Sequence, residues 1–372
     1  MSVLDEGGVT FELPPASEAT IPPERRGVPR DGVRLLVARP DGVDHRRFHD
    51  LPDLLEPGDL VVVNTSATVP SALTGIRDDG RPANVHVATQ LDHGDWVVEV
   101  RRLDDLGPDL DVHAGDRVRL PAGLALRLSE PYPDPVATVS RLWRARPSVP
   151  GPLIRYLAAH GHPIGYRYLA GPVALDELQN VYATEPGSAE MPSAGRPFTA
   201  PLIVRLIAVG VAIAPIVLHA GVSSPELHEP PTPERFTVPD ATARLVTSAR
   251  DAGRRVVAVG TTVVRALETV ALPGGGLRAG HGWTNLVLGP RRRARVTTGL
   301  VTGLHAPEAS HLSLLEAVAG TRLVQRAYGE AVRERYLWHE FGDSMLFLPD
   351  LDDPETVEPV ATHWIETLHA AA

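Results

Sequence analysis

Two histidines in the sequence each follow a short apolar run. His219 comes after Pro215-Ile216-Val217-Leu218, and His305 comes after Leu300-Val301-Thr302-Gly303-Leu304. An imidazole titrates near neutral pH and can therefore act as a general acid or base. A lone histidine more often packs in a structural role, but two at equivalent strand ends leave catalysis open as an alternative.

The segment of residues 256–268 combines an apolar run, a Gly-Thr-Thr turn and a charged pair. Its first four residues predict a buried strand, and Arg265 and Glu268 then lie on the first turns of a helix. Ligands of open α/β sheets collect beyond the carboxyl ends of strands, where free N–H groups of a helix favour anions. We interpret the turn at Gly260 as a ligand site, with an ordinary strand-helix connection as the alternative.

The composition excludes several classes of chemistry. The 372 residues contain no cysteine, which rules out disulfides, thiolate nucleophiles and cysteine-bound metals. All 36 basic residues are arginine, so Schiff-base catalysis and a lysine-containing phosphate loop are excluded. The net charge of -10 argues against nonspecific coating of nucleic acid, although a local arginine patch can still hold a defined RNA.

Other charged clusters give weaker indications. No pair of neighbouring histidines joins carboxylates at the spacing of a metal site, so we predict no metal. The densest positive run, Arg291-Arg292-Arg293 with Arg295, can meet phosphates or simply be solvated. Asp343 can orient a ligand or stabilise a turn.

The order of predicted elements indicates an α/β fold, with a mostly parallel sheet, that carries an inserted all-β barrel. Loops and strands alternate in residues 1–68, and helices and strands alternate in residues 147–372, whereas residues 69–146 contain short, closely spaced strands. We therefore predict a discontinuous α/β body and a separate barrel domain. The predicted barrel strands are residues 84–91, 96–103, 116–120, 124–128 and 136–143. The predicted body strands are 33–38, 60–63, 211–218, 255–259, 286–288, 300–304 and 346–348, and the helices are 199–209, 240–252, 262–271, 311–319 and 321–336.

The apolar stretch of residues 200–218 is long enough to suggest a membrane span, but its pattern indicates a helix followed by a strand. Thr199 is a suitable N-cap, Arg205 interrupts the apolar run, and Gly210 suits the end of a helix. The first residues lack the basic and apolar regions of a signal peptide. We expect a cytoplasmic protein without membrane contact.

One family shares the most specific of these motifs. Its signature V-G-T-T-x-V-R-x-L-E resembles Val257-Ala258-Val259-Gly260-Thr261-Thr262-Val263-Val264-Arg265-Ala266-Leu267-Glu268. Further resemblances follow in order along the chain, at Phe11-Glu12-Leu13-Pro14, Leu55-Glu56-Pro57-Gly58-Asp59, Gln179-Asn180-Val181-Tyr182-Ala183, Leu218-His219, Leu304-His305 and Phe341-Gly342-Asp343-Ser344-Met345. The family is that of the S-adenosylmethionine:tRNA ribosyltransferase-isomerases of queuosine biosynthesis.

The resemblance implies a transferase-isomerase whose partners are S-adenosylmethionine, consumed as a substrate and not as a cofactor, and tRNA. The ribosyl group moves to 7-aminomethyl-7-deazaguanine, forming epoxyqueuosine and releasing adenine and methionine. The sulfonium acidifies the 5′ C–H, so a base can remove that proton and the carbanion can open the sugar ring. We assign His219, His305 and Arg265 to catalysis. The substrate-binding candidates are Asn64, Thr65, Glu185, Ser193, Gly195, Gly221, Glu234, Gly260, Thr261, Thr262, Glu268, Pro307, Glu308 and Asp343.

Several loops depart from the family pattern. The family's N-T-R-V-I-P-A-R-L stands here as Asn64-Thr65-Ser66-Ala67-Thr68-Val69-Pro70-Ser71-Ala72-Leu73, without either arginine. P-T-A-G-L-H-F becomes Pro192-Ser193-Ala194-Gly195-Arg196-Pro197-Phe198, H-V-G-A-G-T-F becomes His219-Ala220-Gly221-Val222-Ser223-Ser224, and H-x-E-Y is reduced to Glu234-Arg235. The changes indicate a divergent paralogue. Three functions stay possible for such a paralogue: the family reaction, transfer to another nucleoside acceptor, or non-catalytic binding of S-adenosylmethionine or RNA. The sequence does not predict the oligomeric state.

Overall fold

A nine-stranded sheet forms the centre of the body in the computed structural model, which describes residues 8–102, 107–223, 231–307 and 309–351. Its strands lie in the order β15-β13-β12-β3-β14-β16-β17-β1-β2. Their bounds are β1 Arg34–Arg39, β2 Gly42–Arg47, β3 Leu60–Asn64, β12 Ala212–Leu218, β13 Glu234–Val238, β14 Val256–Val259, β15 Gly280–Thr284, β16 Gly299–Gly303 and β17 Ser344–Phe347.

The middle of this sheet is parallel and its outer part is mixed. Strands β12, β3, β14 and β16 pair in parallel, so their carboxyl ends meet at one edge. Strand β17 runs antiparallel to β16, and β13 runs antiparallel to β12. The predicted α/β class is confirmed, with antiparallel pairs towards both sides of the sheet.

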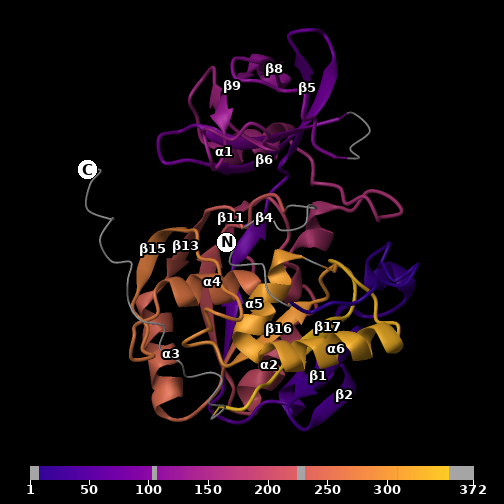
Figure 1. Cartoon of the computed structure of the whole chain (residues 1–372), viewed down its shortest axis with the longest axis vertical. Coiled ribbons are helices and arrows are strands. Elements are labelled where there is room, and N and C mark those ends of the chain that lie inside the picture. Colours follow the sequence, from indigo (N-terminus) through magenta and orange to yellow (C-terminus); the bar gives the residue numbers. More distant parts are fainter. Residues whose placement is uncertain (1–7, 103–106, 224–230, 308, 352–372) are drawn as a thin grey trace.

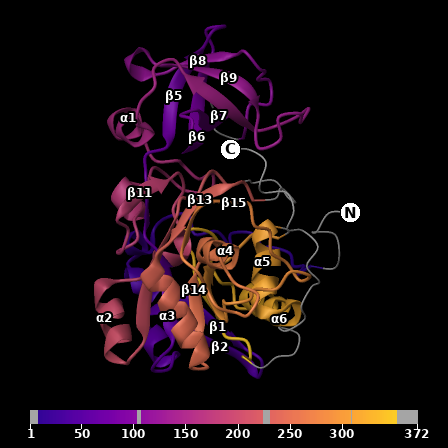
Figure 2. The same ribbon diagram turned by 90° about the vertical axis from the view of Figure 1, so that its left-hand side faces the viewer.

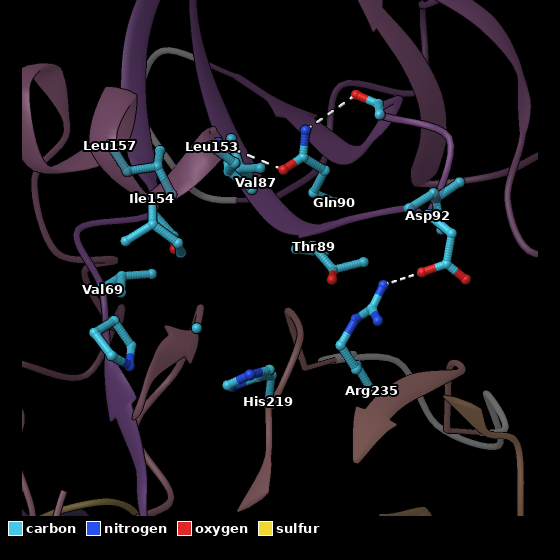
Figure 3. A pocket seen from close by; sticks show the side chains of 16 residues that line it. Val69, Val87, Thr89, Gln90, Asp92, Leu153, Ile154, Leu157, His219 and Arg235 are labelled. Carbon is cyan, nitrogen blue, oxygen red and sulfur yellow. Dashed lines mark hydrogen bonds and ion pairs between the residues drawn. The ribbon is translucent and has the colours of Figure 1, made fainter. Parts of the chain in front are cut away.

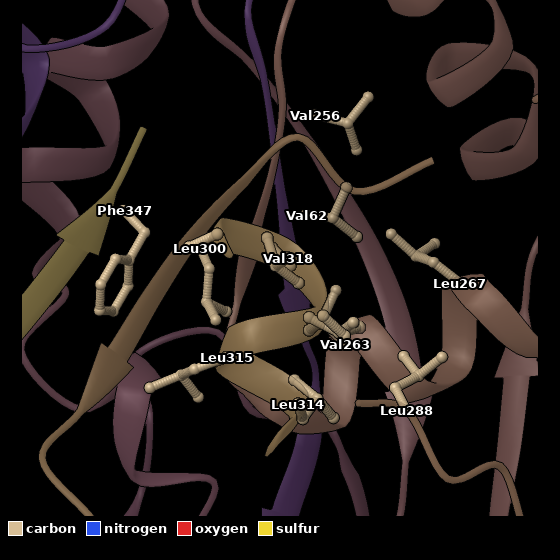
Figure 4. Close-up of a cluster of buried hydrophobic side chains, with 14 of the residues drawn as sticks. Val62, Val256, Val263, Leu267, Leu288, Leu300, Leu314, Leu315, Val318 and Phe347 are labelled. Carbon is tan, nitrogen blue, oxygen red and sulfur yellow. The ribbon is translucent and has the colours of Figure 1, made fainter. Parts of the chain in front are cut away.

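Helices cover both faces of the sheet because its central strands are apolar on both sides. In β3, Leu60 and Val62 pack with helices α3 (Asp240–Asp251), α4 (Thr261–Thr269), α5 (Ser310–Ala319) and α6 (Thr321–Arg333), as Figure 4 shows for part of this core. Val61 and Val63 point to the other face, where α2 (Ala200–Ala208) packs. Such all-round burial is typical of central parallel strands.

The chain leaves the body after β3 and builds a closed six-stranded barrel in the order β10-β7-β6-β5-β8-β9. Its strands are β5 Ala72–Arg77, β6 Pro82–Gln90, β7 Trp96–Arg101, β8 Arg117–Arg119, β9 Ala125–Pro131 and β10 Leu142–Pro147. The barrel stands on one side of the body in both views (Figures 1 and 2). Helix α1 (Leu153–His160) follows it and buries Leu153 and Leu157 in the barrel core. The predicted limits of the insertion, residues 69 and 146, stay a prediction.

A small two-stranded sheet lies where the barrel meets the body. Strand β4 (Ser66–Thr68) leads out of the body, and β11 (Glu185–Ser188) pairs with it in parallel. Figure 1 shows the two strands side by side. Because the Thr65 N–H donates to the Ile216 carbonyl and the Glu185 N–H donates to the Thr65 carbonyl, the pair lies next to the carboxyl ends of β3 and β12.

Most predicted elements are present, and the differences have local causes. Thr199 caps α2 through the Leu202 N–H, and Gly210 follows that helix with a φ of 85°, as predicted. Residues 286–288 are not a strand: Leu286 and Leu288 are buried in the core without pairing, and β15 forms the edge instead. The predicted strand 136–143 begins only at Leu142, since Pro133, Asp134 and Pro135 favour turns. Among the described helices, none is long and apolar enough to cross a membrane.

Candidate functional site

His219 lines two cavities: one lies between the barrel and the carboxyl edge of the sheet and is called the cleft below, and the other is bounded by residues of the body alone. One cavity, of about 430 Å³, is bounded by Thr89 and Gln90 of the barrel, by Ile154 of α1 and by Arg235 of β13 (Figure 3). The other cavity, of about 540 Å³, includes Thr65, Glu185, Ile216 and Thr237. Volumes of this size are usual for small-molecule sites. The cleft is therefore our candidate active site.

The His219 ring is held in place from two sides. Its Nδ1 lies 2.8 Å from the Ser66 hydroxyl, which in turn lies 2.6 Å from the Ser188 hydroxyl. Gly187 packs against the ring, and a Cβ at that position would stand only 2.4 Å from Nδ1. The ring therefore has a fixed orientation at the floor of the cleft.

The surroundings of His219 favour the neutral imidazole. Burial lowers the pKa of His219, and the nearby Arg235 guanidinium lowers it further, while Glu185 acts in the opposite direction. Arg235 forms an ion pair with Asp92 of the barrel and stacks over the Trp283 ring. At neutral pH the ring is uncharged and can accept or donate a hydrogen bond in the cleft.

Asn64 ties the ends of the two central strands together. Its amide group donates to the Leu218 carbonyl at 2.8 Å and accepts from the Leu218 N–H at 3.0 Å. The same Oδ1 accepts from the Ser66 N–H at 3.1 Å. With 1% of its surface exposed, Asn64 is a buried positioning residue, which agrees with its place near the site but leaves its predicted contact with substrate untested.

Arg265 lies in the interior, and its guanidinium donates four hydrogen bonds. It pairs with the Glu234 carboxylate and donates to the carbonyls of Thr232, Thr284 and Leu286. Glu234 in turn accepts the Gly221 N–H at 3.1 Å. The predicted catalytic role of Arg265 stays a prediction, and its contacts here are those of a residue that fixes the loop after His219.

His305 lies apart from His219 at the same sheet edge. Three strand spacings separate β12 from β16, which amounts to about 14 Å. The His305 ring stacks on His311 with 4.7 Å between centroids, and its Nε2 lies 3.0 Å from the Thr302 hydroxyl. Burial lowers its pKa well below the usual value. His305 lines neither of the two cavities that His219 lines, and at this separation we do not expect both rings to act on the same proton.

Two carboxylates predicted to bind substrate, Glu268 and Asp343, accept hydrogen bonds from the backbone, and their contact with substrate stays a prediction. The Glu268 carboxylate accepts the N–H groups of Arg295, Val296 and Thr297 at 2.7–3.0 Å, towards the carboxyl end of α4 and away from the cleft. Asp343 accepts the N–H groups of Arg34 and Leu337, each at 2.8 Å. Both carboxylates are buried and used by backbone donors, so they stabilise turns.

The remaining predicted residues lie in three places. Gly221 and Glu234 lie beside His219, while Thr65 and Glu185 line one of its cavities. Gly260, Thr261 and Thr262 start α4 next to Asn64, and the turn Ser193–Gly195 lies against them through Ala194, which is close to Gly260. Pro307 is half-buried near His305, and Glu308 lies outside the described residues.

Sequence reasoning did not single out the residues that complete the cleft. Ser66 and Ser188 contact each other across β4 and β11, and Thr89 and Asp92 come from the barrel. The only signal for Ser66 was its place in a loop that departs from the family pattern. The barrel residues of the cleft could not be identified from the sequence, because no pattern in it shows which side of the barrel faces the body.

The arginine run at residues 291–295 lies away from the cleft. The N–H of Ala294 donates to the Ala317 carbonyl near the end of α5, and the N–H of Arg295 donates to Glu268. Glu268 is seven residues beyond the start of α4, about 10 Å along the helix axis. Among the described residues, no group of three histidine or acidic side chains has the arrangement of a metal site.

Comparisons with known proteins place the chain in a family. The family model described as queuosine biosynthesis protein matches residues 8–347. The chain belongs to this family. An S-adenosylmethionine:tRNA ribosyltransferase-isomerase of Moorella thermoacetica is 37% identical over 91% of this chain and 98% of its own, and that of Thermus thermophilus is 35% identical over 88% and 97%. The crystal structure of an S-adenosylmethionine tRNA ribosyltransferase from Thermotoga maritima matches with a TM-score of 0.51 at 30% identity, covering 91% of this chain and 99% of that one.

One residue that differs from the family motif has a clear structural role. Arg196 stands where the family motif has leucine, and 2% of it is exposed. Its guanidinium pairs with Glu24 at 3.0 Å, donates to the Glu177 carbonyl at 2.9 Å and lies over the Phe341 ring. This substitution therefore changes the packing behind the cleft and does not add a charge to it.

Replacing Glu268 by alanine tests its structural role. Three backbone N–H groups would lose their acceptor, at about 1–3 kcal/mol for each group that stays buried. We expect chemical denaturation to show a loss of several kcal/mol in the free energy of unfolding, and E268Q, which keeps one acceptor oxygen, to lose less. Folded E268A should bind S-adenosylmethionine like the parent; an unchanged stability with lost binding would contradict the assignment.

The stacked pair His305 and His311 predicts a pH-dependent stability. Burial lowers the pKa of His311 to about 4. Between pH 6.5 and about pH 4, the unfolded chain therefore binds a proton at this histidine and the folded chain does not. As the pH is lowered through this window, the free energy of unfolding should fall by up to about 1.4 kcal/mol per pH unit for this group. In denaturation series at several pH values, H311N should reduce the slope by the share of His311, while the other buried histidines keep theirs, and the exposed-site control H113N should leave the slope unchanged. Equal slopes for parent and H311N would contradict the prediction.

Proposed function

We propose that this protein transfers the ribosyl moiety of S-adenosylmethionine to 7-aminomethyl-7-deazaguanine in tRNA, forms epoxyqueuosine, and releases adenine and methionine. The observation that carries the proposal is the cleft with His219 on its floor, in a chain that belongs to the family of queuosine biosynthesis proteins. The curated relatives bear the name of this transfer and isomerisation.

The chemistry asks for a neutral polar group close to a cationic substrate. The sulfonium of S-adenosylmethionine acidifies the neighbouring C–H bonds, and removal of a proton there gives a carbanion that can open the sugar ring. His219 suits such a site because burial and Arg235 keep its ring uncharged near neutral pH. Glu185, in the second cavity beside His219, adds a negative charge that favours the sulfonium, whereas the charge of Asp92 is paired with Arg235.

A second candidate is a protein of the same fold that binds S-adenosylmethionine or RNA without catalysis. The observation that favours it is Ser66, which stands in the loop where the family motif carries an arginine and which now contacts His219. Replacing an arginine by a serine beside the site changes which ligands the cleft can bind.

The decisive assay incubates the purified protein with S-adenosylmethionine and tRNA that carries the aminomethyl base. We expect adenine release with a matching gain in tRNA mass, and we expect H219A to abolish both while its denaturation curve stays like that of the parent. H113A, at an exposed barrel histidine, is the matched control and should keep full turnover.

Other outcomes of this assay distinguish the alternatives. Binding of S-adenosylmethionine without either product would favour the non-catalytic protein. Adenine release only with a free nucleoside acceptor would overturn tRNA as the substrate. Full turnover by H219A would remove His219 from the site.

A row of arginines on the outer face of the barrel supports an RNA partner. Arg117 of β8 lies directly opposite Arg127 of β9, which lies opposite Arg146 of β10. All three side chains are exposed, and Arg146 also pairs with Asp95 at 3.3 Å, so the repulsion across strands lies mainly between Arg117 and Arg127. Like charges opposite each other across strands destabilise a sheet. A phosphate backbone laid across the row would relieve this repulsion and release counterions.

Removing two charges of this row should weaken tRNA binding. For the double variant R117Q/R127Q we expect a lower affinity for tRNA and a salt dependence of log K that is shallower by about 2. Binding of S-adenosylmethionine should not change, because the outer face of these strands does not line the cleft. The control R278Q/R322Q removes two exposed arginines of the body; an equal loss in the control would show that only net charge matters.

A further inference from the structure

Two buried hydroxyl groups stand between the strands of the small sheet and the His219 ring. Ser66 and Ser188 are 1% and 0% exposed, and their oxygens lie 2.6 Å apart. Ser66 lies 2.8 Å from Nδ1 of His219, and the Ser188 oxygen accepts the N–H of Ala220 at 3.0 Å. Within the described part of the chain, these contacts are the full set of partners for both hydroxyls.

The number of available acceptors decides between two directions of the hydrogen bonds that link Ser188, Ser66 and Nδ1 of His219. If Nδ1 carries the proton, it donates to Ser66, Ser66 donates to Ser188, and the hydrogen of the Ser188 hydroxyl has no acceptor. If Nδ1 is unprotonated, Ser188 donates to Ser66 and Ser66 donates to Nδ1, so every hydrogen has a partner. Buried hydroxyl hydrogens without an acceptor are costly, so the second arrangement is favoured.

The consequence concerns the ring nitrogen that faces the cleft. A neutral imidazole with an unprotonated Nδ1 carries its proton on Nε2. Nε2 has no partner among the described residues, and the His219 side chain lines both cavities. A neutral N–H donor therefore points into the cleft.

We propose that Ser66 and Ser188 fix His219 as the neutral tautomer with its proton on Nε2, so that His219 acts on the ribosyl substrate as a hydrogen-bond donor to an oxygen that gains negative charge. The role rests on the proposed function. Once a base other than His219 has taken the 5′ proton, the electron pair of the carbanion forms a C4′–C5′ double bond, and the electrons of the breaking C4′–O4′ bond move onto the ring oxygen. A donor held in advance at that place stabilises this charge without giving up its proton.

The charges around the ring explain why a neutral donor is needed. Arg235 of β13 faces His219 and is paired with Asp92 of the barrel, while Glu185 of β11 lies on the other side. An imidazolium here would repel both Arg235 and the sulfonium of the substrate. It would also need an acceptor for a proton on Nδ1, which reverses both hydroxyls and leaves the hydroxyl hydrogen of Ser188 without an acceptor. The pair thus disfavours protonation of His219.

Nitrogen NMR of the histidine rings in the full-length protein, without substrate, tests the tautomer directly. We expect the His219 resonances to show a proton on Nε2 and none on Nδ1 at neutral pH. In S188A, Ser66 is free to accept or to donate, so the two tautomers should become mixed. A proton on Nδ1 in the parent would overturn the proposal, whether or not the protein turns over substrate.

Kinetics then test the role, since a purely structural serine would not move a pH profile. S188A should lower kcat about tenfold with an unchanged KM for tRNA, as expected for one misdirected hydrogen bond. The acid limb of its pH–rate profile should shift to higher pH, since protonation of His219 is no longer opposed. S188T, which keeps the hydroxyl, should restore the profile, and S248A at an exposed serine of α3 should match the parent.

Substitution of His219 itself separates a donor from a base. A glutamine amide can donate a hydrogen bond from nearly the place of Nε2 but cannot take up a proton. H219Q should therefore keep measurable turnover where H219A keeps none. Equal inactivity of both, together with a parental pH profile in S188A, would overturn the donor role even if the parent carries out the proposed reaction.

Discussion

The amide of Asn64 bonded to the backbone of Leu218 is the interaction on which the site depends. It joins β3 and β12 at the point where both strands end and where ladder hydrogen bonds can no longer hold them. Because the same side chain also holds the Ser66 N–H, it fixes the start of the chain that leaves for the barrel. One buried side chain thus sets the relative positions of His219 and of the hydroxyl that contacts it.

The barrel completes the cleft from the other side. The sheet alone would present His219 at an open edge, whereas β6 and α1 cover that edge with Thr89, Gln90 and Ile154. A cavity walled by a second body excludes water and strengthens each electrostatic interaction within it. The pairing of β4 with β11 anchors the start of the insertion, so the wall keeps its place relative to the floor.

The residues of the family signature serve the scaffold more than the cleft. Arg265 and Glu268 are charged groups inside the body, and a buried charge is stable only when its hydrogen-bonding capacity is used. Arg265 is satisfied by Glu234 and three carbonyls, and Glu268 by three N–H groups. Replacing either residue would leave all of its buried partners without a hydrogen bond. This is why such a signature identifies the fold.

The sequence by itself determined the α/β class, the inserted barrel, the helix capped by Thr199 and the strand that leads to His219, because these features follow from local periodicity and from turn and capping chemistry. Only the tertiary structure decided that His219 and His305 lie at different places along one edge, that Glu268 and Asp343 serve the backbone, and that Ser66 and Ser188 meet at the ring. Residues 66, 188 and 219 are brought together by strand pairing over more than a hundred residues, and no local pattern specifies such a contact. The order of strands in a sheet, and the partner that each buried charge finds, are properties of the whole folded chain.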